Sequence, residues 1–145
     1  MTDVGDLSEL IPHAHRMCLL ETVEHWDDEG IRCATRTHRD PLNPLRSRER
    51  LAALHLCEYG AQAMALHGGL LARRDHGGPA APGLLAGLRQ VELAVDRIDD
   101  IDEPLTVIAN RKLASADGWL YEFEISAGDR RLARGRVTVI PRPGD

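Results

Sequence analysis

One segment, Arg50 to Arg74, is the most prominent feature in the pattern of apolar and polar residues along the chain. This segment contains no proline and is rich in alanine, leucine and methionine, which are good helix formers. Its apolar residues fall on almost every side of a helix: Leu51, Leu54, Leu56, Ala61, Ala63, Met64, Ala65, Leu66 and Leu70. A helix that is apolar all round is normally buried in a core. We therefore predict one long buried helix in the middle of the chain.

A single polar stripe interrupts this apolar surface. His55, Glu58 and Gln62 stand at positions i, i+3 and i+7, so they share one face of the helix. A carboxylate in the middle of a buried helix is costly unless it has a partner or a function. We place the helix at about Arg48 to Arg73, with Ser47 as its N-cap, and expect the functional site on this stripe.

The rest of the chain shows the alternation that is typical of strands. Two strands are predicted before the helix and four after it: Met17 to Glu24, Ile31 to His38, Leu84 to Ile98, Leu105 to Ala114, Trp119 to Ala127 and Arg131 to Ile140. A short helical turn is expected around Ser8 to Ile11. The turns between successive strands are short, which favours antiparallel neighbours.

One apolar helix with about six antiparallel strands is best buried when the sheet curves around it. This arrangement is the hotdog fold, an α+β architecture, and we predict it as a single domain over residues 1–145. The sheet has free edges, and such edges tend to pair with a second subunit. We therefore expect a homodimer, or a heterodimer with another hotdog subunit.

Composition excludes several functions. The net charge of −5 argues against binding to nucleic acid, which calls for a basic excess. No apolar run approaches the length of a membrane span, and the acidic N-terminus does not have the features of a signal peptide. Three widely spaced cysteines, Cys18, Cys33 and Cys57, predict buried thiols in a reducing compartment. The expected location is the cytoplasm.

Other clusters carry weaker chemical signals. His13 and His15, with only a distant carboxylate, are too few ligands for a metal site, so no metal and no cofactor are predicted. Arginines flank both ends of the predicted helix: Arg46, Arg48, Arg50, Arg73 and Arg74. They are either solvated surface charges or contacts for an acidic carrier protein or a phosphopantetheine phosphate.

Two motifs resemble a known family. The segment Ile11 to Val23, with Pro12, His13 and Met17, resembles the opening motif of the hotdog 3-hydroxyacyl-carrier-protein dehydratases. The segment Glu58 to Ala65 (Glu-Tyr-Gly-Ala-Gln-Ala-Met-Ala) resembles their helix signature Glu-x-Met-Ala-Gln-Ala. The continuation to Arg74, and Gly83 to Gly87 with Arg89, look like the branch of predicted dehydratases from aryl-polyene-type pigment pathways.

The resemblance implies an enzyme that converts a 3-hydroxyacyl thioester to the 2-enoyl thioester in fatty-acid or polyene biosynthesis. The acyl group would be carried on the phosphopantetheine of an acyl carrier protein or on coenzyme A. In the family a helix carboxylate assists departure of the hydroxyl, and a histidine from the preceding loop removes the α proton. Glu58 falls on that carboxylate and Gln62 on the family's glutamine.

The chain departs from the family at the loop. Residues 39–54 contain neither histidine nor glycine, so the usual loop base is missing. His55, one turn before Glu58, and His38, just ahead of the loop, are the candidate replacements. Two alternatives to a dehydratase therefore stay open: an acyl thioesterase in which Glu58 activates water or attacks as nucleophile, and a catalytically weak hotdog subunit that completes an active partner.

Overall fold

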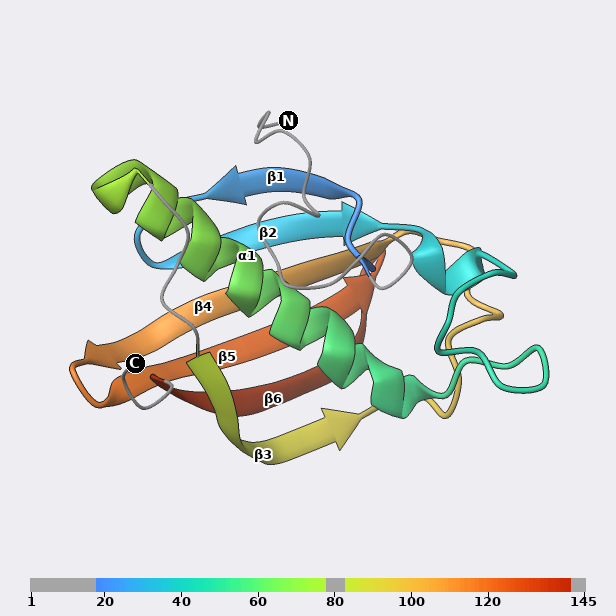
Figure 1. The fold of residues 1–145 in the computed structure, drawn as a ribbon. Helices are drawn as coiled ribbons and strands as arrows, with labels where there is room; N and C mark the ends of the chain where they lie inside the picture. Colours follow the sequence, from blue (N-terminus) through green and yellow to red (C-terminus); the bar gives the residue numbers. More distant parts are fainter. Residues whose placement is uncertain (1–17, 78–82, 142–145) are drawn as a thin grey trace.

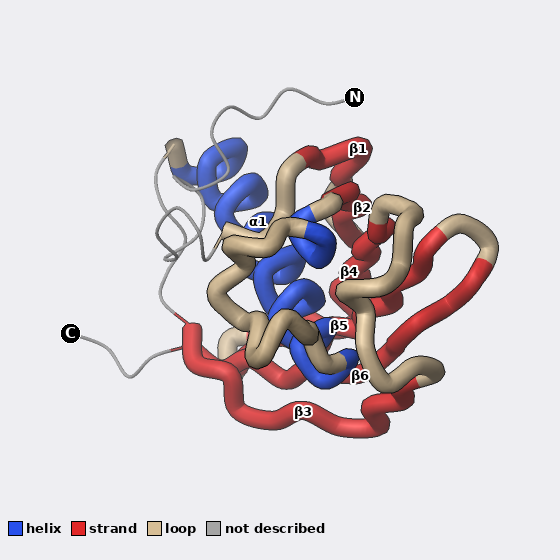
Figure 2. The backbone as a smooth tube through the Cα atoms, turned by 90° about the vertical axis from the view of Figure 1, so that its right-hand side faces the viewer, coloured by secondary structure: helices blue, strands red, loops and turns tan. Residues whose placement is uncertain are grey.

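The computed structural model describes residues 18–77 and 83–141, which form one long helix and a six-stranded sheet that curves around it (Figures 1 and 2). The strands are β1 (Thr22–Trp26), β2 (Gly30–Thr35), β3 (Gly83–Leu93), β4 (Leu105–Ser115), β5 (Gly118–Ala127) and β6 (Arg130–Pro141). The helix is α1 (Leu56–His76), preceded by two 3-10 turns, η3 (Thr37–Arg39) and η4 (Ala53–His55).

The sheet is antiparallel throughout, with the order β1-β2-β4-β5-β6-β3. The chain enters α1 after β2, and β3 then starts at the opposite edge of the sheet, so β1 and β3 are both edge strands. The helix crosses the concave face and packs mainly against β2, β4 and β5 (Figure 1). This is the predicted hotdog architecture, and the prediction is confirmed.

Alternation along the strands separates the core from solvent. On β5, Tyr121, Phe123 and Ile125 are buried toward the helix, whereas Glu122 and Glu124 face outward. Their neighbours on β6 alternate in register, and the outward Arg136 forms an ion pair with Glu122 at 2.8 Å. The outer face of the sheet therefore carries charged side chains that pair across neighbouring strands, and the concave face is apolar.

The close approach of helix and sheet depends on glycine. A Cβ on Gly60 of α1 would lie 2.6 Å from the Phe123 ring, and a Cβ on Gly135 of β6 would meet the same ring at 2.6 Å. Phe123, buried on β5, thus fills a slot between a helix glycine and a strand glycine. The rest of the core is mostly aliphatic, and it includes the fully buried Tyr59 of α1.

The predicted start of the helix is wrong by two turns. The α-helix begins at Leu56 rather than Arg48, and Ser47 lies in a tight turn instead of at an N-cap. Residues 51–53 run beside the β3–β4 connection: Ala53 N–H donates to Asp96 O (2.9 Å) and Ile98 N–H donates to Leu51 O (2.9 Å). The predicted end is close, because Gly77 adopts a left-handed φ of 68° and caps the helix by donating to Arg73 O.

Strand predictions differ from the structure mainly at their ends. Strand β2 stops at Thr35, so His38 lies in η3, and β3 ends at Leu93 where Ile98 was expected. The first strand spans Thr22–Trp26, later than predicted. The turn expected around Ser8 to Ile11, the family-like residues 11–17 and the candidate pair His13 and His15 lie outside the described residues.

Candidate active site at the start of helix α1

The polar stripe lies at the N-terminal end of α1. His55 closes η4 with helical dihedral angles (φ −66°, ψ −11°), so it continues the geometry of α1 and shares the face of Glu58 and Gln62 as predicted. Burial increases along the stripe. His55 and Glu58 are half-buried, whereas Gln62 is fully buried. The carboxylate therefore stands between the solvent-facing end of the helix and its interior.

Gln62 holds a distant part of the chain against this face. Its Oε1 accepts a hydrogen bond from Leu19 N–H at 2.8 Å. The carbonyl of Leu19 accepts hydrogen bonds from the hydroxyls of Thr35 and Thr37, each at 2.6 Å. The peptide groups of Leu19 are thus bound to α1 on one side and to the end of β2 on the other. The sequence left open whether Gln62 orients Glu58 or only fills a polar pocket, and no local pattern indicated Leu19.

A buried tyrosine extends this network. Tyr59 OH lies 2.9 Å from Thr37 Oγ1 and 3.1 Å from Asn43 Nδ2. Because Thr37 donates its proton to the Leu19 carbonyl, Tyr59 donates to Thr37 and accepts from Asn43. Burial raises the pKa of Tyr59, which keeps the phenol protonated. This chain of bonds fixes the helix turn next to Glu58, and sequence reasoning missed it.

His38 is held away from solvent. Its side chain is completely buried, and Nε2 lies 2.9 Å from Ile101 O in the β3–β4 connection. A carbonyl can only accept, so Nε2 carries the proton and Nδ1 does not. Burial lowers the pKa of His38, and among the described residues Nδ1 has no hydrogen-bond partner. This geometry is that of a structural histidine; a catalytic role for His38 stays a prediction.

His67, for which the sequence pattern indicated no role, is fully buried within a polar network. Nε2 lies 2.7 Å from Asp27 O, and Nδ1 lies 2.6 Å from Tyr121 OH. The first contact requires a proton on Nε2, so Tyr121 donates to Nδ1. Both ring nitrogens are therefore used in joining α1 to β5 and to the β1–β2 turn.

His55 is consequently the histidine best placed to act beside Glu58. Of the histidines whose side chains the structure describes, His38 and His67 are enclosed and hydrogen-bonded, and His25 lies exposed on β1 beside Asp27. His55 alone in this set is both partly accessible and on the face of Glu58. The structure brings His55, Glu58 and Gln62 onto one face and leaves His38 outside that group.

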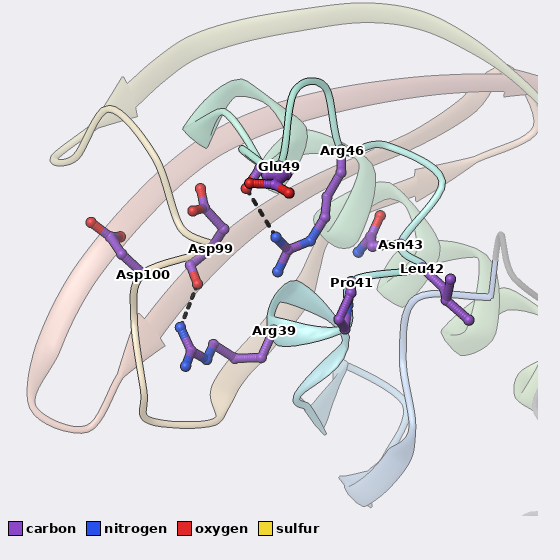
Figure 3. Close-up of a pocket in the computed structure, with 8 residues that line it drawn as sticks. All are labelled: Arg39, Pro41, Leu42, Asn43, Arg46, Glu49, Asp99 and Asp100. Carbon is purple, nitrogen blue, oxygen red and sulfur yellow. Dashed lines mark hydrogen bonds between the residues drawn. The ribbon is translucent and has the colours of Figure 1, made fainter.

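A cavity opens next to this end of the helix, between residues 39–49 and the β3–β4 connection (Figure 3). Its volume is about 680 Å³, and it is lined by Arg39, Pro41, Leu42, Asn43, Arg46, Glu49, Asp99 and Asp100. Glu58 and His55 are not among these residues. Asn43 lines the cavity, and its side-chain nitrogen Nδ2 also donates a hydrogen bond to Tyr59 OH. Asn43 therefore connects the cavity wall to the site. Because the wall carries charges of both signs, the cavity is better suited to contact a polar surface than to hold an acyl chain.

Among the described residues, no group of three or more histidine, cysteine, aspartate or glutamate side chains is arranged to hold a metal ion. No described helix combines the length and apolar character needed to cross a bilayer.

Comparison with known proteins identifies the family. The model of the ApeP-like family, described as ApeP dehydratase, matches residues 5–145. The chain belongs to the ApeP-like dehydratase family. Among solved structures it is similar to the dehydratase heterocomplex ApeI:P from Xenorhabdus doucetiae, with a TM-score of 0.82 and 26% identity over 94% of this chain and 91% of that one.

More distant structures share the fold of this ApeP-like protein. A hypothetical thioesterase with coenzyme A from Streptococcus pneumoniae TIGR4 gives a TM-score of 0.62 at 13% identity, covering 83% of this chain and 84% of that one. The E. coli PaaI protein from the phenylacetic acid degradation operon gives 0.57 at 15% identity, covering 81% and 80%. The search of curated proteins found no match. At these identities the likeness shows the hotdog fold and no particular activity.

Proposed function

We propose that this ApeP-like protein dehydrates a 3-hydroxyacyl thioester, carried on an acyl carrier protein, to the 2-enoyl thioester. The observation that carries the proposal is Glu58, a half-buried carboxyl group on α1 within the signature of a dehydratase family that matches nearly the whole chain. In the reaction the C2–H and C3–O bonds break, a C2=C3 double bond forms, and water leaves. The carboxyl group of Glu58 protonates the departing hydroxide.

The remaining roles follow from accessibility. His55, partly accessible on the face of Glu58, is the candidate base for the C2 proton. Gln62 Oε1 accepts a hydrogen bond from Leu19 N–H, so at least part of its role is to hold the Leu19 backbone against the helix. The buried ring of His38 supports the β3–β4 connection. No resident cofactor is needed, because the acyl group arrives on phosphopantetheine.

We further propose that the working unit contains a second hotdog subunit. Support comes from the similarity to a protein solved as a heterocomplex and from the edge strands β1 and β3. A partner would also supply a base if His55 is not sufficient. The three cysteines, Cys18, Cys33 and Cys57, are reduced in this structure, which suits a reducing compartment and supports the cytoplasm as the location.

The first prediction tests Glu58. Glu58→Gln preserves volume and hydrogen bonding but removes proton transfer, so enoyl formation should fall about 10²-fold or more, as expected for a lost general acid–base group. Interconversion of 3-hydroxyacyl and 2-enoyl thioesters, followed by mass spectrometry, measures it. Glu29→Gln, on the exposed β1–β2 turn, is the control and should keep full activity. Unchanged turnover in folded Glu58→Gln would remove Glu58 from the mechanism.

The same assay separates the alternatives. His55→Ala should lose activity if His55 is the base, whereas retention of activity in both His55→Ala and His38→Ala would assign the base to the partner. Steady release of free thiol without any enoyl product would support the thioesterase instead. Activity that appears only after a hotdog partner is added, and survives Glu58→Gln, would show that the chain is a supporting subunit.

A further inference from the structure

The start of helix α1, which carries Glu58, is not held by capping side chains. At the N-cap positions of η4 and α1 stand Ala52 and His55, and neither forms a side-chain capping bond. Helices are normally fixed at this end by serine, threonine, aspartate or asparagine, and a 3-10 turn has poorer hydrogen-bond geometry than an α-helix. Glu58, in the first turn of α1, therefore depends on contacts made elsewhere for a fixed position.

Two side chains that follow Glu58 supply such contacts, and they meet at one distant peptide. Gln62 Oε1 accepts from Leu19 N–H at 2.8 Å. Tyr59 OH lies 2.9 Å from Thr37 Oγ1, which donates to Leu19 O at 2.6 Å. Tyr59 and Gln62 are three residues apart on the helix, so α1 closes these bonds into a ring. Two anchors nearly one turn apart restrain both rotation of the helix about its axis and movement along it.

The direction of each proton around Tyr59 is fixed. Asn43 Oδ1 accepts from Leu45 N–H at 2.9 Å, so its Nδ2 faces Thr37 O at 2.9 Å and Tyr59 OH at 3.1 Å. Tyr59 accepts from Asn43 and donates to Thr37, and burial, which raises the pKa of Tyr59, keeps the proton on the phenol. Successive hydrogen bonds of one direction strengthen one another in a buried site.

Asn43 joins this ring to the loop that precedes the helix. Its side chain is buried, and it lines the cavity beside residues 39–49 (Figure 3). The loop that contains no histidine is therefore still bonded to the helix one residue away from Glu58, through an amide and a phenol. Neither group is a base near neutral pH, so this bond suits the placement of a catalytic group.

We propose that Tyr59 is a positioning residue for Glu58. Its hydroxyl, held between Asn43 and Thr37, fixes the rotation of the first turn of α1 and so the direction of the neighbouring carboxyl group. The proposal rests on the proposed dehydration, in which Glu58 protonates the leaving hydroxide. Adjacent residues of one helical turn rotate together, so release of Tyr59 displaces Glu58. A displacement of about 1 Å in a catalytic group lowers the rate by up to about 10²-fold.

The first experiment removes only the hydroxyl. In Tyr59→Phe, kcat should fall about 10-fold, while KM should stay within about 2-fold because the fully buried ring does not touch the substrate. The matched control is Tyr121→Phe, which removes the hydroxyl of the other tyrosine, buried on β5 and bonded to His67. Both variants should lower the midpoint of thermal unfolding, and only Tyr59→Phe should lower kcat.

Thr37 tests the same bond from its other side. Thr37→Val has the same shape without the hydroxyl and should lower kcat at least as much as Tyr59→Phe, whereas Thr37→Ser keeps the hydroxyl and should keep the wild-type kcat. Adding Tyr59→Phe to Thr37→Val should lower kcat no further, because two residues that act through one bond are not additive. A further decrease in the double variant would reject action through this bond.

Hydrogen exchange gives a readout that needs no substrate. In Tyr59→Phe, the amides of residues 55–62 should exchange faster than in the wild type, and those of residues 66–74 should be unchanged. Tyr121→Phe should show the opposite pattern, because its hydroxyl bonds to His67. Faster exchange along the whole helix in Tyr59→Phe would show a general loss of stability and reject a local role.

The outcomes separate this inference from the proposed function. Wild-type kcat in Tyr59→Phe, beside an inactive Glu58→Gln, would reject the positioning role and leave the proposed function standing. An equal decrease of kcat in Tyr121→Phe, or a raised KM at unchanged kcat in Tyr59→Phe, would also reject it. If the wild type dehydrates no thioester, the proposed function fails, and the exchange pattern alone decides whether Tyr59 fixes the first turn of α1.

Discussion

At the residue scale, the buried histidines carry the clearest physical signature. His67 is neutral in the folded protein because both its nitrogens are matched to neutral partners, Asp27 O and Tyr121 OH. A proton on Nδ1 would oppose the hydrogen bond from Tyr121. Burial lowers the pKa of His67, with Arg111 adding to the effect and the charges of Asp27 and Asp28 opposing it.

This lowered pKa predicts the pH dependence of stability. Above the unfolded pKa of about 6.5, both states are neutral and the stabilisation is complete. As the pH falls below about 6.5, the unfolded state binds the proton first, and the free energy of unfolding decreases by up to about 1.4 kcal/mol per pH unit for this group. Urea denaturation of wild type and His67→Gln between pH 5 and 8 measures the difference.

His67→Gln should show a shallower decrease below pH 6.5 than wild type. The decrease should not vanish, because burial also lowers the pKa of His38. Identical slopes in the two proteins would contradict the structural role assigned to His67.

At the element scale, the close packing of α1 on β5 requires glycine only where the helix faces the sheet. Gly60 and Gly68 both lie inside α1, where alanine is the better helix former by about 1 kcal/mol. A Cβ at Gly60 would overlap Phe123, whereas a Cβ at Gly68 meets nothing within 4 Å. The same substitution should therefore have opposite effects at two positions two helical turns apart.

We expect Gly60→Ala to lower the free energy of unfolding by about 1–3 kcal/mol, the usual cost of overpacking a core. Gly68→Ala should raise the free energy of unfolding by up to about 1 kcal/mol, because it limits the unfolded chain without a clash. Chemical denaturation of both variants gives the two values. A stabilised Gly60→Ala protein would mean that the helix lies farther from β5 than described.

At the scale of the whole molecule, the sheet leaves an apolar edge uncovered. Leu88 and Leu93 on β3 pair with the buried Val137 and Ala133, so they face the concave side, yet they are 41% and 39% exposed. The helix packs mainly on β2, β4 and β5, and the edge strand β3 lies outside this contact area (Figure 2). An edge strand with exposed leucines favours association with another subunit.

The final prediction concerns this edge. Leu88→Lys combined with Leu93→Lys should convert a dimer to monomers in light scattering, whether the wild-type partner is a second copy or another hotdog subunit. Leu113→Lys changes an equally apolar residue, 66% exposed on the β4–β5 hairpin, and should leave the mass unchanged. A stable dimer of the double variant would place the interface elsewhere.

The sequence by itself determined the hotdog architecture and the face of Glu58. Helical and strand periodicity are local, so apolar and polar spacing was enough to give one buried helix, six antiparallel strands and the stripe of His55, Glu58 and Gln62. The match of Glu58 to Ala65 with a dehydratase signature is local in the same sense. Each of these features needs only residues within a few turns or strand positions of one another.

Only the tertiary structure decided how the ends of these elements are used. Residues 48–54 contain no proline or glycine and looked helical, yet Leu51 and Ala53 hydrogen-bond to residues 96–99. Gln62 binds Leu19, 43 residues away, and His38 binds Ile101, 63 residues away. Polar groups of a buried backbone must find partners wherever the folded chain places them, and that choice is not encoded in local spacing.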